Sequence, residues 1–80
     1  MKAHMREHVH FAVCLDNDGY EASLQVGKLY RVIPDNEAES HGYLRVVDES
    51  GEDYAFAITR FHPVALPDKV EAKLCMAAHA

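Results

Sequence analysis

The sequence of 80 residues has no tryptophan, two cysteines, four glycines and three prolines. Cys14 and Cys75 lack CxxC spacing and further cysteine partners, so we expect free thiols, with one structural disulfide as the alternative. The isolated glycines form no phosphate-binding loop. No apolar run approaches the roughly 20 residues that cross a bilayer, and the first residues lack the apolar segment of a signal peptide. We therefore expect a cytoplasmic protein without a membrane partner.

Basic residues are also scarce. Eight Lys and Arg stand against 13 Asp and Glu, which gives a net charge of −5. Nucleic-acid binding normally requires the opposite sign, so DNA and RNA are disfavoured as partners. The composition is that of a folded protein, with 49% hydrophobic and 26% charged residues. A chain of this length predicts one domain, residues 1–80, which buries only about 60% of its unfolded surface.

Short segments of alternating apolar residues, separated by turn formers, predict an all-β protein. Proline ends the second predicted strand at Pro34, and Gly51 is available for a positive φ in a tight turn. A DxxE sequence at Asp68 resembles a capping box before an Ala-rich, Lys-rich segment. We predict strands over 8–15, 28–33, 43–47, 53–58 and 64–66, loops over 16–23 and 34–42, a hairpin turn over 48–52, a 3₁₀ turn over 59–61 and a helix over 68–79.

The alternation also predicts which side chains form the core. On the first strand it places Phe11 and Val13 on one face, and His10, Ala12 and Cys14 on the other. Tyr20 and Phe61 fall in connections, and we expect both to be exposed. The predicted core is Phe11, Val13, Leu29, Val32, Leu44, Val46, Tyr54, Phe56, Ile58 and Val64.

This order of strands, loops and turns is typical of a five-stranded SH3-like barrel with a short C-terminal helix. Three segments, 24–32, 45–54 and 60–64, resemble a family of small, functionally uncharacterised bacterial proteins with that fold. The most distinctive parts are LxxGKxY from Leu24 and DESGEDY from Asp48. The resemblance covers roughly residues 9–66 and implies the barrel over about 8–66. Eukaryotic SH3 domains bind polyproline segments through a tryptophan that this chain lacks, and Ala57 stands near the expected shelf proline, so that ligand is disfavoured.

Acidic residues concentrate in the predicted connections, and this pattern suggests a binding surface. Ten of the 13 carboxylates lie in the two loops and in or directly beside the hairpin turn, and these connections contain no Lys or Arg. In an SH3-like barrel the first two loops flank one groove, where six carboxylates would attract a cationic partner. The alternative is that these loops are simply solvated and that their acidic residues keep the protein soluble. The candidate binding residues are Asp16, Asp18, Tyr20, Glu21 and Phe61.

Metal binding and catalysis have weaker support. The DNDG segment from Asp16 lacks the spacing and flanking helices of a calcium loop. His8 and His10, with His4 nearby, share one strand face without a complete set of zinc ligands, so we expect solvated histidines, no metal and no cofactor. Ser40 adjoins His41, but adjacency in sequence does not orient a nucleophile.

We therefore interpret the chain as a non-enzymatic interaction module for a cationic protein or peptide. A structural protein that self-associates through an edge strand or the C-terminal helix is the alternative. A third, weaker interpretation is nucleic-acid binding by a local basic patch of Lys28, Arg31, Arg45 and Arg60.

Overall fold

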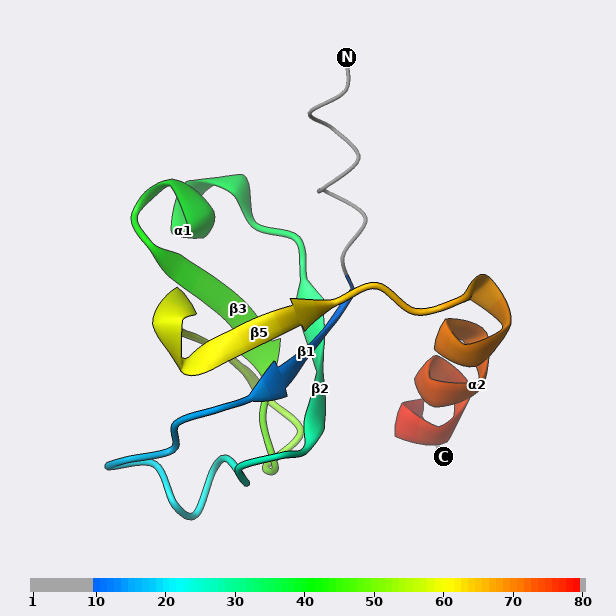
Figure 1. The fold of residues 1–80 in the computed structure, drawn as a ribbon, viewed down its shortest axis with the longest axis horizontal. Helices are drawn as coiled ribbons and strands as arrows, with labels where there is room; N and C mark the ends of the chain where they lie inside the picture. The colour runs from blue at the N-terminus through cyan, green and yellow to red at the C-terminus, as the bar shows by residue number, and fades with distance from the viewer. Residues whose placement is uncertain (1–9, 80) are drawn as a thin grey trace.

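The chain folds into a five-stranded antiparallel sheet followed by a C-terminal helix (Figure 1). This computed structural model describes the backbone of residues 10–79 and the side chains of residues 10–74. The strands are ordered β4-β3-β2-β1-β5. The elements are β1 (Phe11–Cys14), β2 (Leu29–Ile33), α1 (Asn36–Ser40), β3 (Tyr43–Val47), β4 (Asp53–Ala57), the 3₁₀ turn η2 (Ile58–Arg60), β5 (Phe61–Val64) and α2 (Asp68–His79).

The sheet curls on itself without closing. β2 pairs with β1 on one side and with β3 on the other, so it belongs to both halves of the curl. The 3₁₀ turn η2 brings the chain from β4 at one edge to β5 at the other, and the rings of Phe56 and Phe61 approach to 6.0 Å between centroids. β4 and β5 are nevertheless not neighbours in the strand order. The sheet is therefore open, and the predicted barrel is not confirmed.

The core lies on the concave side of this curl, and about half of the predicted core is correct. Phe11, Val32, Leu44, Val46 and Phe56 are buried as expected. The prediction is wrong for Leu29, Tyr54 and Ile58, which are exposed, and for Val13 and Val64, which are partly exposed. The buried residues that it missed are Ala12, Cys14, Leu24, Tyr30 and Phe61.

On β1 the alternation is present but the core face is the opposite one. Ala12 and Cys14, both fully buried, belong to the core cluster, whereas Phe11 is buried outside it. β1 is an inner strand, between β2 and β5. Small side chains on its concave face leave space for the rings that approach from β2, β4 and β5.

The ends of several elements differ from the sequence prediction. β1 is Phe11–Cys14 instead of 8–15, of which residues 8 and 9 lie outside the described residues, β2 begins at Leu29 instead of 28, and β4 ends at Ala57 instead of 58. The 3₁₀ turn comes one residue earlier than expected, at Ile58–Arg60, and the last strand is Phe61–Val64 instead of 64–66. The second loop contains the short helix α1, which the sequence prediction missed. Asp35 caps it by accepting a hydrogen bond from the Ala38 N–H at 3.0 Å. Asp followed by Asn, Glu and Ala is the signal that could have shown this helix.

The hairpin turn and the C-terminal helix are confirmed. Gly51 has a φ of +86° between β3 and β4. α2 spans the predicted 68–79 and lies to one side of the sheet, near the start of β1 (Figure 1). Glu71 in α2 accepts a hydrogen bond from His10 Nδ1 at 2.9 Å, which tethers the helix beside β1. No helix within the described residues is long and apolar enough to cross a membrane.

Candidate functional site

The first loop, residues 15–28, is compact because its own backbone and one buried side chain hold it. Tyr20 N–H donates to the Asn17 carbonyl at 2.7 Å, and Leu24 N–H donates to the Tyr20 carbonyl at 2.9 Å. Asn17 Nδ2 donates to the Leu24 carbonyl at 2.9 Å. The Leu24 side chain is only 1% exposed and fixes the end of the loop in the core. These contacts set the position from which Tyr20 projects.

The first loop packs against the β3–β4 hairpin, not against the second loop. Glu49 N–H in the hairpin donates to the Ser23 carbonyl at 3.0 Å. The Glu49 carboxylate also accepts hydrogen bonds from Lys28 Nζ, at 2.7 Å, and from the Tyr30 hydroxyl. The first and second loops lie at opposite ends of β2 (Figure 1), so the expected groove between them is wrong.

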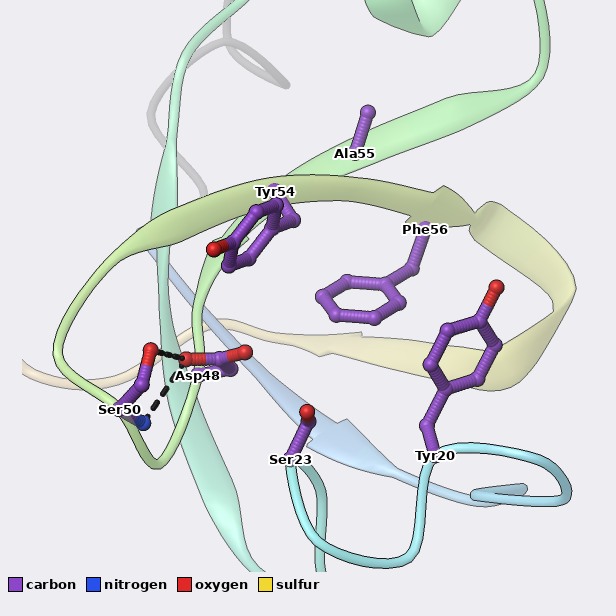
Figure 2. A pocket seen from close by; sticks show the side chains of 7 residues that line it. All are labelled: Tyr20, Ser23, Asp48, Ser50, Tyr54, Ala55 and Phe56. Atoms are coloured by element: carbon purple, nitrogen blue, oxygen red, sulfur yellow. Dashed lines mark hydrogen bonds between the residues drawn. The ribbon is translucent and has the colours of Figure 1, made fainter.

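A hollow opens where this loop, the hairpin and β4 meet. It has a volume of about 370 Å³. Figure 2 shows the side chains around it: Tyr20, Ser23, Asp48, Ser50, Tyr54, Ala55 and Phe56.

Three aromatic rings form the apolar part of the hollow. Phe56 is buried at its centre, while Tyr20 and Tyr54 are 44% and 48% exposed at its margins. The Tyr20 ring meets Phe56 edge to face at 5.2 Å between centroids, and Tyr54 meets it at 6.5 Å. The Tyr54 hydroxyl donates to Glu52 Oε1 at 2.8 Å, and this bond raises the pKa of Tyr54. Both tyrosine rings are thus held beside Phe56.

Asp48 provides the polar part of the hollow. Its Oδ1 accepts hydrogen bonds from the Ser50 N–H, at 2.9 Å, and from the Ser50 hydroxyl. Its other carboxylate oxygen points toward the centre of the hollow (Figure 2) and receives no hydrogen bond from any described residue. Asp48 is only 6% exposed. Among the described residues no buried side-chain oxygen or nitrogen lacks a hydrogen-bond partner, so this second oxygen is in contact with solvent. A donor that enters the hollow could therefore replace water at this oxygen.

Of the five predicted binding residues, one lines the hollow and the other four do not. Tyr20 lines the hollow. Asp16 does not line it, and its Oδ1 lies 3.4 Å from Arg60 Nη1, so this loop carboxylate is paired with a cation. Asp18 and Glu21 are exposed on the loop, and Glu21 accepts a hydrogen bond from Gly19 N–H at 3.2 Å.

Phe61 does not belong to this surface, and the prediction that it is exposed is wrong. Phe61 lies in the core with only 4% of its surface exposed, and its ring meets the Tyr30 ring edge to face, with 6.5 Å between the ring centroids. Because η2 ends at Arg60, Phe61 is the first residue of β5 and its side chain points inward. Arg60 takes the outer position instead, with its guanidinium 4.8 Å from the Tyr20 ring centroid.

Sequence reasoning missed most of the hollow. It did not select Ser23, Asp48, Ser50 or Ala55 as binding residues, and it assigned Tyr54 and Phe56 to the core. The one available signal was Asp48 followed by Ser50 and Gly51, in which an Asp side chain bonds the backbone two residues on. That motif predicts a turn, but it does not show that the second oxygen faces a hollow.

Two other depressions of the described surface have charged side chains in their lining. The first, of about 320 Å³, lies beside α1 and contains Arg45, whose guanidinium donates to Asp35 at 2.8 Å and to Asp53 at 3.1 Å. Ala38 N–H and Arg45 lower the pKa of Asp35. The second, of about 660 Å³, lies between the sheet and Leu74 of α2, and the ion pair of Lys28 with Glu49 is at its margin. Arg45 and Lys28 are thus paired with carboxylates of the fold, whereas Arg31, which also lines the second depression, has no hydrogen bond or ion pair with another described side chain.

Cys14 is free and buried, and burial raises the pKa of its thiol. Among residues 10–74, no three His, Cys, Asp or Glu side chains converge as metal ligands would. His4 and His8 lie outside the described residues, as does the Cys75 side chain.

Comparison of the chain with protein-family models, curated proteins and solved structures finds no match in any of the three.

Proposed function

We propose that this protein is a non-enzymatic interaction module that binds a cationic segment of a protein or peptide in the hollow between the first loop, the hairpin and β4. The observation that carries the proposal is the second carboxylate oxygen of Asp48, which faces a hollow lined by three aromatic rings and accepts no hydrogen bond from a described residue. A cation that enters the hollow would satisfy this oxygen and contact the rings at the same time.

The chemistry of the lining residues supports a cation over other ligands. Aromatic faces attract cations within about 6 Å of their centroids, and this attraction strengthens when water is excluded. Of the described residues that line the hollow, none is Lys or Arg. An anion would meet the Asp48 carboxylate without compensation, and a purely apolar ligand would leave its oxygen unsatisfied. The net charge of −5 adds long-range attraction for a basic partner.

The proposal includes an SH3-like architecture of the kind found in small bacterial proteins. The supporting features are the long first loop, the order of the five strands, the 3₁₀ turn between β4 and β5, and the curl that brings Phe56 to Phe61. Binding beside the first loop is compatible with that architecture. The partner we propose is recognised by charge and by aromatic contact, without a polyproline helix.

The test is an NMR titration of ¹⁵N-labelled protein with the peptide acetyl-Gly-Lys-Arg-Gly-amide. We expect chemical-shift changes in residues 20–23 and 48–56, and none with acetyl-Gly-Gln-Gln-Gly-amide. Asp48→Asn keeps the acceptor for Ser50 and removes the charge, so binding should fall about tenfold or more. Glu39→Gln, on an exposed residue of α1 at the other end of β2, is the charge-matched control and should bind like wild type. Shift changes confined to α1 or α2, or none, would overturn the proposal.

A second candidate function is self-association through the β4 edge, because the open sheet leaves this edge unpaired. The pairs Asp48 with Glu52 and Gly42 with Ile58 are hydrogen-bonded, so alternation directs the Ala55 N–H and C=O away from β3. Such an edge can pair with another copy. Sedimentation velocity over a range of concentrations should then show a dimer that Ala55→Pro abolishes, since proline at this outward N–H spares the bonds to β3. A monomer at all concentrations would exclude this function.

A further inference from the structure

We infer that the hollow selects a primary ammonium group, as carried by a lysine side chain, over a guanidinium or a trimethylammonium group. The inference rests on the proposed function and specifies the cation. Three features of the site favour an ammonium group: the number of free acceptors, the shape of the hollow and the occupied face of Tyr20.

Only one oxygen of Asp48 is available to a ligand, and this favours a cation that needs a single carboxylate oxygen as acceptor. Oδ1 already accepts two hydrogen bonds from Ser50, so only the inward oxygen remains available. A guanidinium binds carboxylates best as a two-pronged fork, which needs both oxygens. An ammonium needs one oxygen, and its other N–H groups can reach the Ser23 hydroxyl, whose side chain also points into the hollow (Figure 2).

The same oxygen disfavours a ligand whose ammonium group is fully methylated. A trimethylammonium group is attracted to aromatic rings but has no N–H to donate. It would displace water from the Asp48 oxygen and leave that oxygen buried without a hydrogen bond. The aromatic rings alone therefore do not decide which cation fits.

One face of the Tyr20 ring, on which a guanidinium could stack, is already covered by Arg60. Arg60 lies over the ring at 4.8 Å from its centroid and is held there by the Asp16 side chain and carbonyl, at 3.4 and 3.2 Å. A lysine instead needs apolar surface for its four-carbon stem, which Phe56 and Tyr54 offer along β4. A hollow of about 370 Å³ accommodates that stem and its ammonium.

The test compares four probes of similar length by the same NMR titration: the Nα-acetyl, N-methylamide derivatives of lysine, arginine, Nε-trimethyl-lysine and norleucine. We expect the lysine probe to shift residues 48–56. The arginine and trimethyl-lysine probes should bind about tenfold more weakly, and the norleucine probe should cause no shift there. Ser23→Ala should weaken the lysine probe and leave the trimethyl-lysine probe unchanged. Asp48→Asn should remove the preference for lysine over trimethyl-lysine.

The outcomes separate this inference from the proposed function. Equal binding of the three cations at residues 48–56, or tightest binding of trimethyl-lysine or arginine, would overturn the ammonium selectivity and leave the cationic site standing. If none of the cations binds there, the site itself is wrong. Unchanged lysine binding in both Ser23→Ala and Asp48→Asn would also overturn the inference, because it depends on these two acceptors.

Discussion

The hydroxyl of Tyr30 joins two segments that are distant in sequence. It accepts a hydrogen bond from the Gln25 N–H at 2.7 Å and donates to the Glu49 carboxylate, while its ring is 4% exposed. Lys28 pairs with the same carboxylate at 2.7 Å, and the two donors lower the pKa of Glu49. The Tyr30 hydroxyl thus links the first loop to the hairpin, and both of these segments contribute residues to the lining of the hollow.

Tyr30→Phe should therefore destabilise the fold while keeping the ring in the core. The substitution leaves the Gln25 N–H without its acceptor and removes one of the two donors to Glu49, at a cost of about 1–3 kcal/mol in the free energy of unfolding. Urea denaturation monitored by circular dichroism measures this loss. Tyr43→Phe, on an exposed tyrosine of β3, is the matched control and should change stability by less than about 0.5 kcal/mol. Equal stability of both variants would contradict the bridging role.

The same hydroxyl predicts a loss of stability in alkali. Burial, followed by the hydrogen bond to Glu49, raises the pKa of Tyr30 to about 12. In the unfolded chain a tyrosine titrates near pH 10, so its contribution is complete below about pH 10 and is lost as the pH rises toward 12. The wild type should lose roughly 2–3 kcal/mol over this range. Tyr30→Phe should lose less, and parallel pH profiles of the two proteins would show that Tyr30 titrates normally.

At the scale of elements, the hairpin depends on a backbone conformation that only glycine adopts freely. Gly51 has a φ of +86°, and a Cβ built there would meet nothing within 4 Å. Gly51→Ala should therefore cost about 1 kcal/mol or more through backbone strain alone, without a steric clash. Gly51→Asn should cost less, because Asn tolerates positive φ better than Ala. Thermal unfolding of the three proteins checks this order, and increased stability of Gly51→Ala would refute the turn.

The position of η2 determines which residues enter the core between β4 and β5. Phe61 is buried and Ile58 is 36% exposed, the reverse of the sequence prediction. Phe61→Ala should cost about 3–5 kcal/mol, enough to abolish cooperative unfolding in a domain of marginal stability. Ile58→Ala should cost less than about 2 kcal/mol. If Ile58→Ala proves the more damaging in thermal unfolding, the turn is displaced by one residue or more.

What the sequence could predict depended on how local each signal was. The hairpin and α2 were predictable, because Gly51 and the helix-forming residues after Pro67 act on their own neighbours. The core face of β1 was not, because it depends on the rings that other strands bring against Ala12 and Cys14. The hollow was least predictable, since the Glu49 N–H that bonds the Ser23 carbonyl is 26 residues away along the chain. Local patterns identify loops but do not show which loops meet.

At the scale of the whole molecule, the excess of acidic residues is partly neutralised within the fold. Asp16 pairs with Arg60, Asp35 and Asp53 pair with Arg45, and Glu49 pairs with Lys28. The acidic loops are therefore less bare than their sequences suggest. The net charge of −5 nevertheless remains, and Asp18 and Glu21 are exposed on the first loop, which contributes Tyr20 and Ser23 to the hollow. Long-range attraction and contact in the hollow thus come from different carboxylates.

This division predicts two distinct kinetic effects on binding of acetyl-Gly-Lys-Arg-Gly-amide. Converting Asp16, Asp18 and Glu21 to Asn, Asn and Gln should lower the association rate constant and flatten its dependence on salt, because such attraction is screened beyond about 8 Å at physiological ionic strength. Asp48→Asn should instead raise the dissociation rate constant, because it removes a contact inside the hollow. NMR line-shape analysis at two salt concentrations measures both constants. Folding should survive the triple change, since exposed loop charges contribute less than about 0.5 kcal/mol each. Unchanged association in the triple variant would show that the first loop's charge serves solubility and not recognition.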